Sequence, residues 1–328
     1  MVIYYKKFMQ GYEKMNKSQF IFKAIDVVFD KSQNPYNIDN IYYISDIPYS
    51  DADKTLTKGD LYFSPLMLND AKKHPIILNI HGGGFVMGDK EYRRTLSELY
   101  ASRGYYVYNI NYRMPPAVNI FGCIEDCIKA ANYILTLSEE YNIDTDKIII
   151  TGDSAGAFLA AYIAAVKFND SLSKETNLPD VKIDIAGLVL NSGPYDLQAM
   201  LSTKLPMGII PELASMLVGS GCTEDINDIY QNEFFRYMSA KQYVNDKWCP
   251  AFISWSDSDF ICPNQGRPMA EVLKKHCPRV VTTYEDGLLY GHDYHLTLKN
   301  EKSMKCVESG IEFMDSICKE IDEKKAAV

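Results

Sequence analysis

The stretch 147–166 constrains the fold more than any other part of this chain. The run Lys147-Ile148-Ile149-Ile150-Thr151 has the uninterrupted apolar character of a buried strand. Small, apolar residues at 157–166 predict a helix, so only Gly152-Asp153-Ser154-Ala155-Gly156 separates the two elements. Because the two glycines carry no β-carbon, strand and helix can approach closely. The pattern therefore predicts a tight, strained turn with Ser154 exposed at its centre.

The rest of the chain alternates strands and helices in the same way. We expect further strands at residues 76–80, 105–110, 185–190, 251–255 and 280–284. Apolar residues recur at helical spacing over about 124–141 and 304–321. This alternation predicts an α/β fold, a mostly parallel central sheet with helices on both faces. For 328 residues we expect a single domain, 1–328, with an added cap.

Two stretches fit the alternation poorly, and we interpret both as a helical cap. The first covers approximately residues 1–50 and is rich in Tyr and Lys, and the second covers 197–243. The second stretch carries many large apolar side chains: Met200, Leu201, Leu205, Met207, Ile209, Ile210, Leu213, Met216, Leu217, Phe234 and Phe235. These side chains could form the wall of a binding pocket or could simply pack against the sheet.

Composition narrows the possible partners. The net charge of −9, without a Lys- or Arg-rich stripe, argues against nucleic acid as a partner. No segment has the apolar length of a signal peptide or a membrane span, and we expect a cytoplasmic protein. The eight cysteines are scattered, so we interpret them as reduced thiols. Cys123 and Cys127 could share a helix face, but no second pair has zinc-site spacing, so we predict no metal and no cofactor.

A glycine loop lies upstream of the serine turn. His81-Gly82-Gly83-Gly84-Phe85 directly follows the strand predicted at 76–80. Consecutive glycines allow backbone N–H groups to face a cavity without a side chain in the way, which is what a developing oxyanion requires. A merely flexible turn is the alternative. We expect His81 to brace the loop by hydrogen bonds, and Asp153 to point away from the serine in a similar structural role.

Several motifs together resemble the hormone-sensitive-lipase-like branch of α/β-hydrolase esterases, often described as acetyl esterases and carboxylesterases. They occur in that family's order, over roughly residues 60–298: His81-Gly82-Gly83-Gly84, Tyr112-Arg113, Glu125-Asp126-Cys127 and Gly152-Asp153-Ser154-Ala155-Gly156. The resemblance implies that the amides of Gly83, Gly84 and Ala155 form an oxyanion hole. Met114-Pro115-Pro116-Ala117 departs from the family's Leu-Ala-Pro-Glu, and Ala157 stands where a glycine is usual.

The base and the acid should follow the nucleophile in the order serine, acid, histidine. His292, in Tyr290-Gly291-His292-Asp293-Tyr294, resembles the family's His-Gly-Phe, and His295 is its competitor. His276 lies in a polar helix-end context and is less suitable. Asp259 stands at the family's distance before a proline, with Asp257 as the alternative. His292 and His295 could also suggest a metal, but they lack a third ligand.

These residues predict a serine hydrolase of small-molecule carboxylic esters that acts through Ser154, His292 and Asp259. Trp255 and the aromatic residues of the cap lead us to expect short acyl chains, such as acetyl. Two other functions remain open. The same residues could cleave an amide or a peptide bond, and a hydrolase-like scaffold could serve as a binding protein without catalysis.

Overall fold

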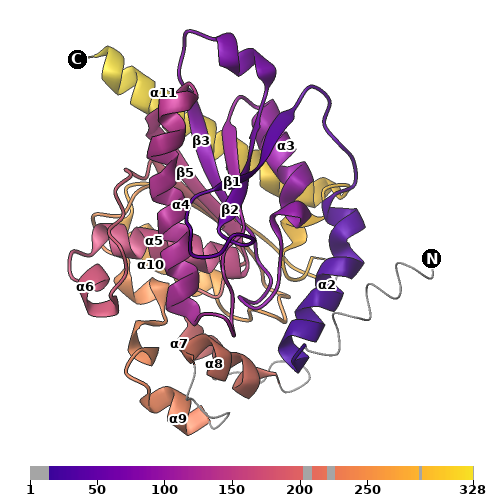
Figure 1. The fold of residues 1–328 in the computed structure, drawn as a ribbon, viewed down its shortest axis with the longest axis vertical. Coiled ribbons are helices and arrows are strands. Elements are labelled where there is room, and N and C mark those ends of the chain that lie inside the picture. The colour runs from indigo at the N-terminus through magenta and orange to yellow at the C-terminus, as the bar shows by residue number, and fades with distance from the viewer. Residues whose placement is uncertain (1–14, 202–208, 220–225, 288–289, 328) are drawn as a thin grey trace.

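A computed structural model describes residues 15–201, 209–219, 226–287 and 290–327. Its eight strands form one sheet in the order β1-β2-β4-β3-β5-β6-β7-β8 (Figure 1). The strands are β1 (Tyr42–Pro48), β2 (Lys58–Phe63), β3 (His74–Ile80), β4 (Tyr106–Ile110), β5 (Ile143–Asp153), β6 (Gly187–Asn191), β7 (Ala251–Ser256) and β8 (Val280–Glu285). Neighbouring strands from β4 to β8 are parallel, which confirms the predicted mostly parallel α/β sheet.

The first two strands correct the predicted cap boundary. Strand β1 falls inside the stretch 1–50 that we expected to belong to the cap, yet it pairs antiparallel with β2 as an edge of the sheet. Aromatic and β-branched residues such as Tyr43 and Ile44 favour an extended backbone, and every residue of this edge strand except Ile47 is exposed. Strand β2 joins β1 to β4 and was not predicted.

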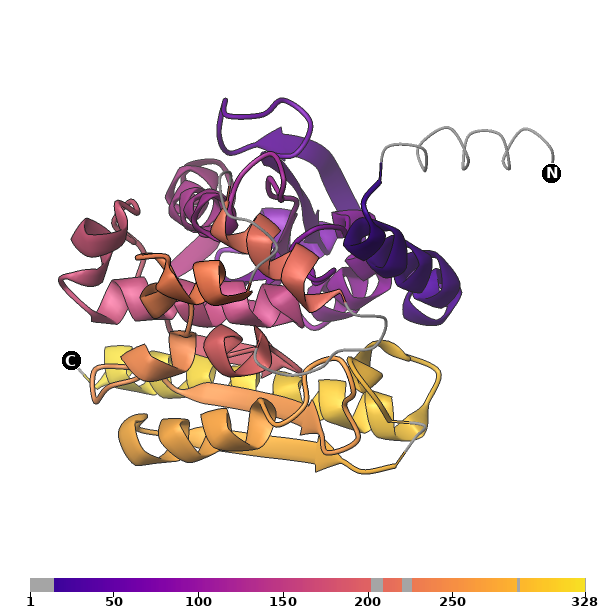
Figure 2. The same ribbon diagram turned by 90° about the horizontal axis from the view of Figure 1, so that it is seen from below.

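Helices cover both faces of the sheet (Figures 1 and 2). Helices α3 (Arg94–Ser102) and α11 (Glu301–Ala326) pack on one face in a core that includes Leu99, Ile149 and Phe313. Helices α4 (Ile120–Glu140), α5 (Ala155–Phe168) and α10 (Gly266–His276) belong to the larger core on the other face. Helix α5 is buried along nearly its whole length because its residues are mostly alanine and other apolar side chains.

The remaining helices lie beyond the sheet, with α7, α8 and α9 at the lower end of Figure 1 and α2 at its right side. They are α2 (Lys17–Gln33), α7 (Leu197–Leu201), α8 (Ile210–Val218) and α9 (Ile226–Gln231). The short helix α6 (Leu172–Thr176) is separate from this group and lies between α5 and β6 in the sequence. Glu212 of α8 accepts hydrogen bonds from the amide and the hydroxyl of Ser18 at 2.9 and 2.7 Å, which ties α2 to α8. Leu205 and Met207, expected in the cap, lie outside the described residues.

Two expectations from composition can be compared with the structure. Among the helices built by the described residues, none has the length and apolar character needed to cross a membrane. The cysteines within the described ranges are free thiols: Cys123, Cys127, Cys249, Cys262, Cys277, Cys306 and Cys318. Cys222 lies outside those ranges.

The predicted turn between β5 and α5 depends on its two glycines. A β-carbon at Gly156 would lie 2.0 Å from the carbonyl oxygen of Ile80, and one at Gly152 would lie 2.4 Å from the backbone of Gly156. Ser154, between them, has a φ of 49° and a ψ of −121°, an unfavourable conformation for a residue with a side chain. Close packing of strand and helix therefore holds the serine in a strained backbone.

Replacing Gly156 by alanine should destabilise the fold, because backbone on β3 must move to admit the methyl group. We expect Gly156→Ala to lower the free energy of unfolding by about 1–3 kcal/mol in urea denaturation. Gly310→Ala, where a β-carbon would meet its nearest neighbour at 3.8 Å, is the matched control. It should keep the stability or raise it by about 0.5–1 kcal/mol, since alanine favours a helix. Equal effects of the two substitutions would contradict this account.

Candidate active site

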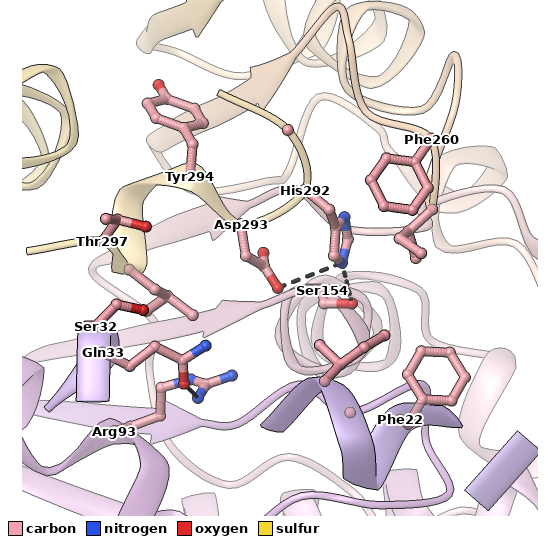
Figure 3. Close-up of a pocket in the computed structure, with 15 residues that line it drawn as sticks. Phe22, Ser32, Gln33, Arg93, Ser154, Phe260, His292, Asp293, Tyr294 and Thr297 are labelled. Atoms are coloured by element: carbon pink, nitrogen blue, oxygen red, sulfur yellow. Dashed lines mark hydrogen bonds and ion pairs between the residues drawn. The ribbon is translucent and has the colours of Figure 1, made fainter. Parts of the chain in front are cut away.

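Ser154 lies where β5 ends and α5 begins, at the edge of the sheet formed by the ends of the parallel strands. Its side chain is at hydrogen-bond distance from His292, with 2.8 Å between Oγ and Nε2. His292 comes from the loop that follows β8, 138 positions further along the chain. The structure thus brings together the serine and the histidine selected from the sequence (Figure 3).

Asp259 contacts the other nitrogen of the same imidazole. Its Oδ2 lies 2.7 Å from Nδ1 of His292. Its Oδ1 accepts hydrogen bonds from the amides of Ile261 and Cys262, at 2.9 and 2.8 Å. Burial opposes ionisation of Asp259, but His292 and these amides outweigh burial and keep the pKa of the carboxyl below its ordinary value. Asp259 therefore presents a fixed, charged acceptor to the ring.

The alternatives considered for these two roles have other partners. Asp257 accepts hydrogen bonds from Arg267 and from the indole of Trp255, at 2.6 and 2.9 Å. His276 pairs with Asp246 at the surface. His295 is buried, and among the described residues neither of its ring nitrogens has a hydrogen-bond partner. Burial lowers the pKa of His295 to about 3, so this ring is neutral.

Asp153 has the structural role expected of it, since it bonds to Arg93 and Gly82 in a buried ion pair. Arg93 donates to both of its oxygens, from Nε at 2.6 Å and from Nη2 at 2.5 Å. The amide of Gly82 adds a third bond, at 3.0 Å. Burial opposes the charge on Asp153, yet Arg93 keeps the pKa of this carboxyl below its ordinary value. Arg93 was not singled out in the sequence, because no local motif marks it.

His81 occupies the structural position expected from the sequence. Its ring stacks on Tyr112, with 4.5 Å between centroids, and its Nδ1 lies 2.7 Å from the carbonyl oxygen of Gly82. The next two glycines, Gly83 and Gly84, have φ values of 120° and 60°. A β-carbon at Gly83 would lie 1.9 Å from the carbonyl oxygen of Met87. Only glycine fits this backbone without strain.

The amides of Gly83, Gly84 and Ala155 are available to a ligand. Among the described residues, none accepts a hydrogen bond from these three amides. Gly83 lines one cavity beside Ser154, and Gly84 and Ala155 line a second. Ala155 is also the first residue of α5, where backbone amides lack a partner within the helix and attract negative charge.

Two cavities meet at Ser154. The larger has a volume of about 240 Å³ and combines apolar side chains such as Phe22 and Phe260 with polar ones such as Gln33 and Asp293 (Figure 3). The smaller, about 10 Å³, is almost entirely apolar. Its walls come from the glycine loop, the serine turn, α2, the cap and the loops after β6 and β7: Phe22, Gly84, Phe85, Ala155, Pro194, Met200, Leu213, Ile261 and Cys262.

The aromatic residues at these cavities differ from those expected. Trp255, which we expected to shorten the acyl pocket, instead stacks on Tyr284 at 5.2 Å between centroids and lines neither cavity. Its strand, β7, directs this side chain toward α10, where it packs on Gly266. Phe234 and Phe235 of the cap also line neither cavity. Phe22 takes their place because α2 lies over the glycine loop.

One group of side chains has the composition of a metal site. Asp259, Cys262 and His292 present ligand atoms that all lie within 4.8 Å of one another. However, Asp259 and His292 already use these atoms in a hydrogen bond to each other. Burial also raises the pKa of the Cys262 thiol well above its ordinary value, and a protonated thiol is a poor ligand. The arrangement fits acid–base chemistry better than metal binding.

Comparison with solved structures agrees with this fold. Esterase B from Lactobacillus rhamnosis superposes with a TM-score of 0.80 at 19% identity, covering 94% of this chain and 98% of that one. A bacterial heroin esterase has a TM-score of 0.68 at 19% identity, covering 94% and 96% of the two chains. The α/β-hydrolase fold is therefore shared with known esterases.

Similar sequences also come from hydrolases. Lipase 2 of Moraxella sp. (strain TA144) is 26% identical over 234 residues, 66% of this chain and 54% of the lipase. Acetyl esterase of Salmonella schwarzengrund (strain CVM19633) is 27% identical over 190 residues, 58% of this chain and 50% of the esterase. The chain thus matches about half the length of these two relatives. The BD-FAE family model matches residues 60–273, most of the chain, and the protein therefore belongs to the BD-FAE family of α/β-hydrolases.

Proposed function

We propose that this protein hydrolyses carboxylic esters with Ser154 as nucleophile. The observation that carries the proposal is the chain of two short hydrogen bonds from Ser154 through His292 to Asp259. A serine hydroxyl attacks a carbonyl only when a base accepts its proton, and the base must be held in the correct tautomer. Asp259 favours the tautomer with hydrogen on Nδ1, which leaves the lone pair of Nε2 facing the serine.

The proposed reaction has two stages. Ser154 Oγ bonds to the ester carbon while its proton passes to Nε2 of His292 and the carbonyl electrons move onto oxygen. The imidazolium then gives that proton to the leaving alcohol, and the C–O bond to the alcohol breaks. Water repeats the sequence on the acyl-enzyme and releases the carboxylic acid.

The negative oxygen formed in each stage needs fixed donors. We propose that the amides of Gly83, Gly84 and Ala155 supply them, since all three lie beside Ser154 and lack protein acceptors among the described residues. One donor of this kind typically contributes a factor of about 10²–10³ to turnover. The mechanism requires no metal and no organic cofactor.

The two cavities suggest how an ester would be bound. We propose that the small apolar cavity behind Ser154 takes a short acyl group, such as acetyl, and that the larger, partly polar cavity takes the alcohol. The names of the similar acetyl esterase and lipase are consistent with an ester substrate. For the location of the protein we retain the cytoplasm as our proposal.

Replacing Ser154 by alanine tests the function itself. We expect Ser154→Ala to lower kcat for p-nitrophenyl acetate by at least about 10³-fold, because the nucleophile is lost while the pocket remains. The same assay with p-nitroacetanilide, the corresponding amide, separates an esterase from an amidase, and we expect the ester to be cleaved much faster. Undiminished ester hydrolysis by Ser154→Ala would exclude Ser154 as the nucleophile, whereas no hydrolysis by the unmodified protein would favour a binding role.

A second test assigns the base and the acid. His292→Ala and Asp259→Asn should each reduce kcat by roughly 10³–10⁴-fold, because the proton acceptor or its correct tautomer is lost. His276→Ala and Asp257→Asn are the matched controls, since both side chains pair elsewhere, and these variants should retain most activity. Circular dichroism checks that all four variants fold. The assignment would be reversed if a control variant lost activity while the variant that it controls, His292→Ala or Asp259→Asn, retained it.

The acyl chain preference tests the small cavity. With p-nitrophenyl esters we expect acetate and butyrate to be cleaved with higher kcat/KM than octanoate. Met200→Ala enlarges this cavity and should raise kcat/KM for octanoate relative to acetate about tenfold or more. Met238→Ala, which changes a buried methionine that lines neither cavity, should leave the ratio unchanged. A fall in the ratio on enlarging the cavity would place the acyl group elsewhere.

A further inference from the structure

A second carboxylate lies beside the imidazole of His292. Asp293 follows it directly in the sequence and lines the larger cavity with Ser154 (Figure 3). Its φ of 54° places this residue in the left-handed region. This backbone turns the carboxylate toward the ring of the preceding residue, although neighbouring side chains usually point apart. The side chain is only 14% exposed.

The carboxylate of Asp293 approaches the nitrogen that faces the serine. Its Oδ2 lies 3.3 Å from Nε2 of His292, and Ser154 Oγ lies 2.8 Å from the same nitrogen. Asp259 holds Nδ1 at 2.7 Å. Both nitrogens of the ring therefore face a carboxylate. The other oxygen of Asp293, Oδ1, is buried and has no hydrogen-bond partner among the described residues.

The charged groups around this pair come from several elements. Asp259 follows β7, Asp153 is the last residue of β5, and Arg93 is the last residue of the turn before α3. His295 lies two residues after Asp293, in the short 3-10 turn Tyr294–Leu296. Arg93 donates to both oxygens of Asp153, and its Nη1 donates to Gln33. His295 is neutral, as described above. The cation best placed to pair with Asp293 is therefore the imidazolium of His292.

The titrations of the two groups are coupled through this contact. Burial alone would lower the pKa of His292, but Asp259 and Asp293 outweigh burial and raise it to about 9. Burial raises the pKa of the Asp293 carboxyl to about 8. The two groups compete for a proton in the same pH range, so a change in one must alter the titration of the other.

We propose that Asp293 is a positioning residue that forms an ion pair with protonated His292 on the Nε2 side of the ring, so that the imidazolium formed during ester cleavage is held between two carboxylates. This inference rests on the proposed function. When Ser154 bonds to the ester carbon, its proton moves to Nε2, and Asp293 stabilises the positive charge from that side. When the proton leaves with the alcohol or returns to the serine, the pairing ends. Asp293 itself forms no covalent bond.

Asp293→Asn tests the proposal through the pH profile of kcat/KM. Asparagine tolerates the left-handed backbone and keeps the shape of the side chain but removes the charge. The imidazolium then loses one partner, so the pKa of His292 falls and the neutral base persists to lower pH. We expect the acid limb of the profile to move down by about one pH unit or more. At pH values on the acid side of the profile, the variant should retain a larger fraction of its maximal kcat/KM than the unmodified protein retains of its own.

Asp257→Asn is the control, since it removes a nearby carboxylate that pairs with Arg267, and its acid limb should not move. If Asp293→Asn does not fold, Asp293→Gly removes the same charge with a residue suited to positive φ. An acid limb that stays in place or moves to higher pH in these variants would overturn the proposal.

A measurement without turnover separates this inference from the proposed function. The titration of His292 can be followed by NMR in Ser154→Ala and in Ser154→Ala combined with Asp293→Asn. We expect the second protein to titrate at lower pH by about one unit. An equal or higher value would refute the pairing even if the protein proves to be an esterase. A lower value would support it even if no ester is cleaved.

Discussion

The buried ion pair between Arg93 and Asp153 connects the parts of this site. Asp153 is the last residue of β5, directly before Ser154, and it also receives the amide of Gly82 from the glycine loop. Burying a carboxylate costs several kcal/mol unless its oxygens are fully paired, and here three donors pair them. The same atoms therefore fix the serine turn relative to the glycine loop, so that the position of Ser154 relative to the amides of that loop depends on this one buried ion pair.

Local patterns in the sequence were sufficient for the parallel core of the fold. The strands around the serine turn are uninterrupted apolar runs, because a parallel strand is buried on both faces. Strands β1 and β2 lack this pattern, since they pair antiparallel at an edge and β1 is largely exposed. For that reason β1 was included in the predicted helical cap, and β2, which lies after that stretch, was not predicted.

Some residues of the site could be predicted from local motifs, whereas others are recognised only from contacts between distant parts of the chain. Ser154, the glycines and the order of acid and histidine belong to motifs, and the structure brings Ser154, His292 and Asp259 into hydrogen-bond distance. Arg93 lies 60 positions from its partner Asp153, so no spacing could reveal that contact. The place of Phe22 beside Ser154 likewise depends on how α2 packs, which only the three-dimensional arrangement gives. Closeness in sequence can also mislead: Trp255 lies four positions before Asp259, yet its ring stacks on Tyr284 and lines neither cavity.

The contact between α2 and α8 has a consequence for how such a protein can change. Both Phe22 and Gln33, which line the larger cavity, belong to α2, outside the segment 60–273 that matches the family model. Glu212 fastens that helix through hydrogen bonds to Ser18, at the N-terminal end of α2. Ser154 and Asp259 lie inside that matched segment, whereas α2 and the loop that carries His292 lie outside it. Substitutions on α2 can therefore change which molecules fit the larger cavity while Ser154, His292 and Asp259 stay in place.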